Sequence, residues 1–210
     1  MEQKTDRPKK SQSISLPSPL GEGQGVRPEG ELKVRLEDLG ERLFFTTFPS
    51  PLGLLRLESD GSSLTALLFE GEQMCHPQGI TLHEKPLLPL FVEAKAWLSR
   101  YFEGQDPGAP PPLRPQGTPF QQRVWQQLLT IPYGSTTTYG HIAKHLAAQG
   151  AMQRMSAQAV GQAVGRNPIS IIIPCHRVIG ANGTLTGYAG GLNRKVFLLN
   201  LEQKQEKLWK

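Results

Sequence analysis

Three consecutive residues in the last fifth of the chain combine a nucleophile, a base and a cation: Cys175, His176 and Arg177. Most lone cysteines are buried and inert, so position and neighbours decide whether one is reactive. Pro174 precedes this cysteine and limits how its backbone can move. A thiolate is the reactive form, and nearby positive charge or a base favours it. The spacing therefore indicates a cysteine that attacks an electrophile.

An apolar run, ISIII at 169–173, leads into this cysteine and predicts a buried strand. Because successive side chains of a strand point to opposite faces, His176 would not touch Cys175. Either the chain turns at Pro174, or a water molecule relays the proton between them.

A base also needs a group that orients it. Residues 118–210 contain only two acids, Glu202 and Glu206. We expect Glu202, in the last predicted helix, to orient His176, against the alternative that it is a solvated surface glutamate.

The segments that must position these residues are mainly helical. Thr118-Pro119, Thr138 and Ser156 are typical helix starts, while Gly150 and Pro168 are typical ends of the second and third helices. Three short helices in a basic segment suggest a helix-turn-helix, although a helical packing module without DNA fits the same spacing. A glycine-rich loop, NGTLTGYAGG, and a closing helix from Leu192 complete this part.

The preceding residues indicate a different architecture. Residues 43–106 combine short apolar strands, a turn at Ser59-Asp60-Gly61-Ser62 and one helix with apolar positions from Leu87 to Phe102. Residues 107–117 form a Pro/Gly-rich connector, and 1–42, rich in Ser, Pro and Gly, predict a disordered tail. The fold class is therefore α+β: a small N-terminal α/β domain (antiparallel sheet plus helix) at 43–106 and a mainly helical domain at 118–204.

Charge and composition limit the kinds of molecule that this chain is expected to bind. The net charge is +5, yet residues 118–210 carry ten Lys or Arg against two acids. Such asymmetry suggests a polyanion such as nucleic acid, although a solvated basic face would look the same. No apolar stretch is long enough for a membrane helix and no signal core follows the N-terminus, so we expect a cytoplasmic protein without a membrane partner. Two cysteines provide no disulfide framework.

Ile173-Pro174-Cys175-His176-Arg177-Val178 resembles the active-site signature of the methylated-DNA–protein-cysteine methyltransferases, also called O-alkylguanine-DNA alkyltransferases. The flanking GTPFQQRVWQQLLTIPYGSTTTYGHIA, VGRNP and TGYAGG resemble the same family. The resemblance spans about 43–210 and is strongest over 118–202. It implies a monomer that binds double-stranded DNA in the minor groove, flips an alkylated guanine out of the stack and transfers the alkyl group to itself, once, without a cofactor.

The resemblance also implies a role for individual residues. Cys175 matches the alkyl acceptor, His176 the base acting through water, Glu202 its orienting carboxylate and Asn167 a residue holding the site. Tyr139, Val178, Tyr188 and Ala189 match the substrate pocket. The expected DNA-contacting residues are Phe120, Tyr139, Ala157, Gln158, Ala159 and Gly161.

The sequence departs from the family pattern at two positions. Gln158 stands where relatives usually carry an arginine that fills the space left by the flipped base, and glutamine lacks that charge and stacks less well. Ala189 replaces a hydroxyl residue of some relatives. Cys75, His76 and His83 match no standard zinc spacing, so we expect no metal site.

Three alternatives remain open at this stage. A relative that binds alkylated DNA and signals damage without transfer would lack the acceptor cysteine. Gln158, in place of the expected arginine, still allows a protein of this kind with poor transfer. A Cys-His hydrolase needs an oxyanion hole and a direct Cys–His contact. A plain helix-turn-helix protein would carry Cys175 as a structural residue.

Overall fold

The computed structural model describes residues 42–72, 74, 76, 80–150 and 155–203. The chain divides into two units, 1–34 and 35–210, and every described element belongs to the second. Of the tail expected at 1–42 only Arg42 is described, and Cys75 and Glu206 lie outside the described residues. None of the described helices has the length and apolar character that crossing a membrane requires.

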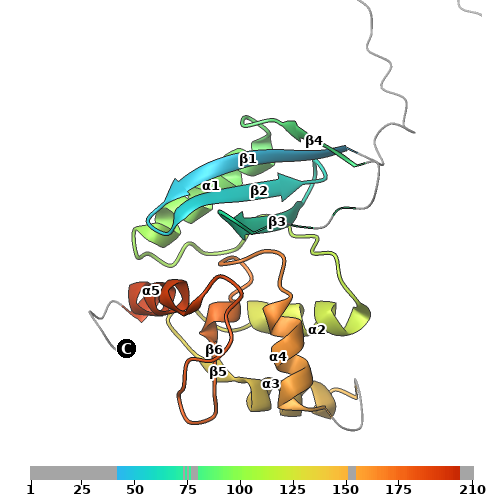
Figure 1. Ribbon diagram of the computed structural model, residues 1–210, viewed down its shortest axis with the longest axis vertical. Coiled ribbons are helices and arrows are strands. Elements are labelled where there is room, and N and C mark those ends of the chain that lie inside the picture. Colours follow the sequence, from blue (N-terminus) through green and yellow to red (C-terminus); the bar gives the residue numbers. More distant parts are fainter. Residues whose placement is uncertain (1–41, 73, 75, 77–79, 151–154, 204–210) are drawn as a thin grey trace, which may run out of the picture. The chain divides into compact units, whose positions relative to one another are not determined.

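Four strands form the N-terminal sheet in the order β3-β2-β1-β4 (Figure 1). They are β1 (Arg42–Ser50), β2 (Gly53–Ser59), β3 (Leu64–Phe69) and β4 (Thr81–Glu84). The first three are antiparallel, as expected, whereas β4 runs parallel to β1. The predicted turn between β2 and β3 is confirmed: the Asp60 carboxylate accepts hydrogen bonds from the backbone of Ser62 and Ser63.

Helix α1 (Pro89–Phe102) completes the N-terminal part, as its apolar spacing predicts. Its buried side chains recur three to four residues apart, so they form one face of the helix. They are Leu90, Phe91, Ala94, Trp97, Leu98 and Tyr101.

The outer edge of β3 joins the N-terminal part to the rest of the fold. Leu64 exchanges backbone hydrogen bonds with the connector at Pro112 and Arg114. Three residues further along the strand, Leu67 donates to Pro168 O and accepts from Ser170 N. An open strand edge would expose unpaired backbone groups. Here these groups hold the segment that precedes Cys175.

Four helices make up most of the C-terminal part: α2 (Pro119–Leu129), α3 (Tyr139–Ala148), α4 (Ala157–Gly165) and α5 (Leu192–Gln203). The three expected caps are confirmed, because Thr118, Thr138 and Ser156 each accept a hydrogen bond from the first turn of their helix. Two short strands, β5 (Thr137–Thr138) and β6 (Val178–Ile179), pair in parallel.

The strand expected at 169–173 is wrong. The segment is a buried turn with only one bridge, between Ile169 and Leu67, and Ile171 adopts a positive φ of 69°. A positive φ is unfavourable for a β-branched residue, so the surrounding contacts must hold it. The apolar run reflects burial on all sides, which a turn inside the core shares with a central strand.

One apolar core includes residues from both parts of the fold, from Leu55 on β2 to Leu198 on α5. The Trp125 ring is buried at its centre and donates a hydrogen bond from Nε1 to Ala163 O (2.9 Å), which ties α2 to α4. At the edge of the fold, Leu129 on α2 and Leu192 on α5 are 40% and 49% exposed. The α+β fold expected from the sequence is confirmed.

Candidate active site

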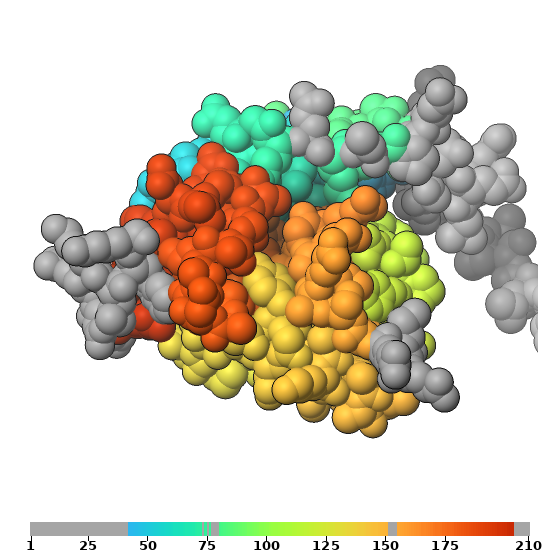
Figure 2. Space-filling model, turned by 60° about the horizontal axis from the view of Figure 1, so that its bottom comes forward, coloured from blue at the N-terminus to red at the C-terminus, as the bar shows by residue number. Residues whose placement is uncertain are grey.

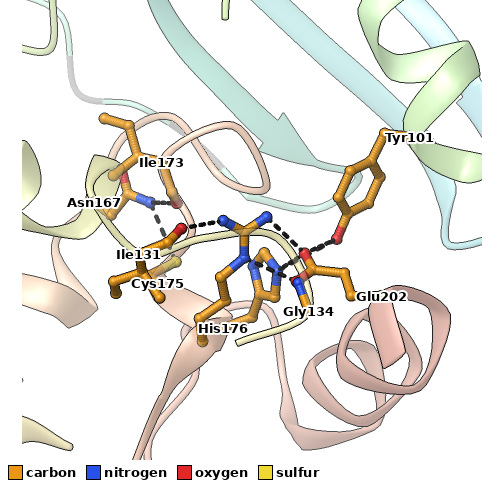
Figure 3. Close-up of polar contacts among 9 residues, drawn as sticks. Tyr101, Ile131, Gly134, Asn167, Ile173, Cys175, His176 and Glu202 are labelled. Atoms are coloured by element: carbon orange, nitrogen blue, oxygen red, sulfur yellow. Dashed lines mark hydrogen bonds and ion pairs between the residues drawn. The ribbon is translucent and has the colours of Figure 1, made fainter. Parts of the chain in front are cut away.

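Cys175 begins a single turn of 3-10 helix, η2 (Cys175–Arg177), directly after the buried turn. The chain does turn at Pro174, one of the two possibilities left open by the sequence. Asn167 holds both ends of the turn: its Nδ2 donates to Ile173 O (2.9 Å) and lies 3.1 Å from the Cys175 sulfur (Figure 3). Its Oδ1 accepts from Ile169 N (3.0 Å). The side chain of Asn167 therefore fixes the position of the nucleophile.

His176, Arg177 and Glu202 form a buried cluster. His176 Nε2 lies 2.6 Å from Glu202 Oε1, and the Arg177 guanidinium contacts both carboxylate oxygens at 2.8 and 3.0 Å. Arg177 also donates to Ile131 O (2.6 Å). Glu202 is 4% exposed, so the alternative of a solvated surface glutamate is wrong. The guanidinium therefore makes its hydrogen bonds to Glu202 and to Ile131 O.

Two further donors complete the shell around Glu202. The Tyr101 hydroxyl donates to Oε1 (2.7 Å) and lies 3.3 Å from His176 Nε2, while the backbone N–H of Gly134 donates to Oε2 (3.1 Å). Burying a carboxylate is unfavourable unless its oxygens are hydrogen-bonded. Here both oxygens have charged and neutral donors, which makes the buried charge stable.

The ionisation of the cluster follows from these contacts. Burial opposes ionisation of Glu202, but the hydrogen bonds and charges of His176 and Arg177 outweigh it and lower its pKa to about 2. Burial lowers the pKa of His176, while Glu202 acts in the opposite direction. A neutral imidazole beside a carboxylate carries its proton on the facing nitrogen, so Nε2 is the donor. Nδ1 is then free to accept, and it has no hydrogen-bond partner among the described residues.

No hydrogen bond joins His176 to Cys175 in the described part of the chain. Burial raises the pKa of the Cys175 thiol above its ordinary value, although the hydrogen bond from Asn167 and the charge of Lys195 act in the opposite direction. Lys195, on α5, is fully buried and donates from Nζ to Val178 O (2.6 Å) and Thr186 O (3.0 Å). Burial lowers the pKa of Lys195 to about 8. The cation that favours the thiolate is thus Lys195 rather than the adjacent arginine.

An open groove of about 640 Å³ lies between α3, α4 and the glycine-rich loop (Figure 2). The Tyr139 hydroxyl donates to Thr186 O (3.0 Å), so the first turn of α3 holds the loop. Burial raises the pKa of both Tyr139 and Tyr188, and the charge of a Cys175 thiolate would raise both further. Six of the residues expected in the pocket or at the DNA line this groove: Tyr139, Ala157, Gln158, Gly161, Tyr188 and Ala189.

The remaining expected residues lie elsewhere. Val178 is fully buried on β6, and its carbonyl oxygen is held by Lys195. Ala159 is half-buried on α4, and Phe120 is half-buried on α2 against the core. Of the weak zinc candidates, His76 pairs with Glu58 at 3.0 Å. The described residues contain no group of three or more potential metal ligands.

Sequence reasoning missed two residues of this site, Tyr101 and Lys195. Tyr101 lies on α1, 75 positions before His176, and reads as part of an apolar helix face. Lys195 lies in a helix where lysine is usually solvated. Of the two, only Lys195 left a signal in the sequence. It lies seven residues before Glu202, which places Lys195 and Glu202 on one face of α5.

Both halves of the chain match known protein-family models. Residues 43–108 match the family model described as 6-O-methylguanine DNA methyltransferase, ribonuclease-like domain, and 119–204 match the one described as its DNA binding domain. The methylated-DNA–protein-cysteine methyltransferase of Haemophilus influenzae is 46% identical over 162 residues, covering 77% of this chain and 87% of the relative. That of Mycobacterium leprae is 51% identical over 156 residues, covering 74% and 90%.

A solved structure shows the same fold. The crystal structure of Mycobacterium tuberculosis OGT in complex with DNA aligns with a TM-score of 0.66 and 47% identity, covering 78% of this chain and 93% of that one. The two family models together match well over half of the sequence. The chain therefore belongs to the 6-O-methylguanine DNA methyltransferase family.

Proposed function

We propose that this protein repairs DNA by transferring an alkyl group from O6 of an alkylated guanine, or from O4 of an alkylated thymine, to Cys175. The observation that carries the proposal is the placement of the sulfur. Cys175 is held by a hydrogen bond from Asn167 and directly precedes the histidine of the buried His176–Glu202 pair, and α3, α4 and the glycine-rich loop line an open groove of about 640 Å³. The relatives bear the name of this reaction, methylated-DNA–protein-cysteine methyltransferase.

The chemistry is a displacement at carbon. The thiol proton passes through a water molecule to Nδ1 of His176, and Glu202 stabilises the resulting imidazolium. The sulfur attacks the alkyl carbon, the bond between that carbon and O6 breaks, and the guanine takes up one proton as it leaves. No proton is gained or lost overall. The thioether product is stable, so each chain reacts once.

Delivery of the base uses the second half of the chain. We assign 118–204 as the alkyltransferase and DNA-binding domain, with α3 and α4 as a helix-turn-helix that lies against the minor groove of duplex DNA. A base inside the stack cannot reach a sulfur that is only 6% exposed, so the nucleotide must be flipped out. The flipped guanine enters the groove between Tyr139 and Tyr188, beside Ala189. We assign 43–106 as the N-terminal domain, 107–117 as the connector, and the working form as a monomer.

Intact mass measurement tests the proposal directly. The protein is incubated with duplex DNA that contains one O6-methylguanine, and the mass of the chain is measured. We expect a gain of one methyl group per chain, located on Cys175 by peptide mapping and absent from Cys175→Ala. A chain that gains no mass would refute the proposal.

A second function has one observation in its favour. Gln158 lines the groove on α4, where a charged side chain would fill the space left by a flipped base more effectively. A protein that binds alkylated DNA and signals damage, with poor transfer, fits a weak flipping residue. If the protein binds the methylated duplex but its mass does not increase, the damage-signalling function is supported.

A further inference from the structure

Tyr101 is the described residue of the N-terminal part whose side chain reaches the His176–Glu202 pair (Figure 3). Its hydroxyl lies 2.7 Å from Glu202 Oε1 and 3.3 Å from His176 Nε2. The two partners come from η2 and α5, far along the chain from α1. One hydroxyl group thus touches the orienting carboxylate and the imidazole at the same point.

Packing holds the Tyr101 ring in one place. The side chain is fully buried. Its ring stacks on Trp97 at 5.5 Å with an interplanar angle of 8°, and Phe102 and Tyr133 contact it edge-on at 5.5 and 6.0 Å. Stacked and edge-to-face pairs at such distances add stabilisation beyond the area they bury. The hydroxyl is therefore a fixed donor rather than one that adapts to the position of Glu202.

The direction of each hydrogen bond follows from the charges. Glu202 is ionised and can only accept, so Tyr101 donates its proton to Oε1. The same oxygen also accepts from His176 Nε2. With Oε1 fixed between the phenol and the imidazole, the ring of His176 can present only Nδ1 to the sulfur side of the site.

On this geometry, and resting on the proposed function, we propose that Tyr101 is a positioning residue for alkyl transfer. Its hydroxyl fixes the carboxylate oxygen that retains the Nε2 proton of His176, so that Nδ1 stays free to accept the proton of Cys175. The N-terminal domain would thereby complete the proton-accepting apparatus, in addition to supporting the fold.

The electrostatic consequence has a definite sign. The charged and titratable groups around His176 are Tyr101 on α1, Glu202 and Lys195 on α5, and the adjacent Arg177. Without the Tyr101 hydroxyl, Glu202 Oε1 accepts one hydrogen bond fewer. Its negative charge is then less neutralised and attracts the imidazolium more strongly. In Tyr101→Phe the pKa of His176 therefore rises. The acidic limb of the pH–rate profile moves to higher pH, because His176 must be neutral to accept a proton.

The experiment compares wild type, Tyr101→Phe and Tyr133→Phe. Single-turnover methyl transfer is followed across a pH series, and the His176 ring is titrated by NMR. We expect Tyr101→Phe to react about tenfold more slowly near neutral pH, the effect of losing one hydrogen bond to a charged acceptor. Its His176 titration should shift upward. Tyr133→Phe is the matched control, because this neighbouring hydroxyl has no hydrogen-bond partner among the described residues.

Each outcome decides the inference. An unchanged rate in Tyr101→Phe overturns it, and so does a slower rate without a shift in the His176 titration, since packing alone would produce that. If Tyr101→Phe does not fold, the tautomer of His176 in the wild type decides: a proton on Nδ1 instead of Nε2 overturns the inference. If wild type gains no methyl group but the titration shifts as expected, the proposed function fails and the positioning role stands.

Discussion

Replacing Glu202 by Gln removes the charge at the centre of the buried cluster. The pKa of Glu202 is lowered from 4.5 to about 2, and each pKa unit corresponds to about 1.4 kcal/mol. The carboxylate form therefore contributes up to about 3 kcal/mol to the free energy of unfolding at neutral pH, because part of the lowering comes from the charge of a protonated His176, which is neutral at that pH. For a chain of this size we expect the variant to melt up to roughly 12 °C below wild type.

The pH dependence of this contribution has a fixed sign. The pKa of the folded state is depressed, so the stabilisation is fully present above the unfolded value of 4.5 and is lost as the pH falls toward about 2. The difference between wild type and Glu202→Gln should stay constant from about pH 7 to about pH 5.5. Below that it should shrink, at most by about 1.4 kcal/mol per pH unit.

Urea unfolding of both proteins at several pH values measures this difference. Glu93→Gln on α1 is the matched control, because Glu93 is exposed and no described contact holds it. Its free energy of unfolding should change by less than about 0.5 kcal/mol. A Glu202→Gln variant within 1 kcal/mol of wild type at neutral pH, or a difference that does not change toward about pH 4, would refute the reasoning.

Three further substitutions test the nucleophile and the groove. Asn167→Ala removes the hydrogen bond to the sulfur, so the pKa of Cys175 should rise and its reaction with a thiol reagent near neutral pH should slow about tenfold; an unchanged pH profile would contradict this. Lys195→Met removes a buried cation, so the pKa of Cys175 should again rise, measured by the same titration, and a fall would count against the assignment. Gln158→Arg should speed repair of a methylated duplex in single-turnover assays, and an unchanged or slower rate would rule that out.

The sequence was sufficient to predict the parts of the site that depend on local pattern. Cys175 and His176 are adjacent in the chain, and Glu202 is one of only two acids in the basic segment. Helix starts at Thr118, Thr138 and Ser156 were predictable because a cap depends on a few neighbouring residues. These features depend on neighbouring residues or, for Glu202, on the small number of acidic residues in the segment.

The features that the sequence did not predict depend on contacts between residues that are far apart in the chain. The run at 169–173 is apolar because it is enclosed, and hydrophobicity alone does not separate a buried turn from a buried strand. Tyr101 looks like any other residue on an apolar helix face until α1 is packed against α5. The arginine next to Cys175 was expected to favour the thiolate, but the tertiary structure commits it to Glu202.

The pairing of Leu67 with Pro168 and Ser170 has a consequence for the order in which the molecule matures. Backbone contacts between residues about 100 positions apart form late, because closing a long loop costs entropy before any contact compensates for it. The unfavourable backbone at Ile171 cannot persist without that pairing. A chain still emerging from the ribosome therefore lacks the turn that precedes Cys175, and its thiol is an ordinary cysteine thiol. Folding buries this thiol, which raises its pKa, and brings it to the Asn167 side chain that holds it. The thiol is therefore positioned for its single reaction only when folding is complete.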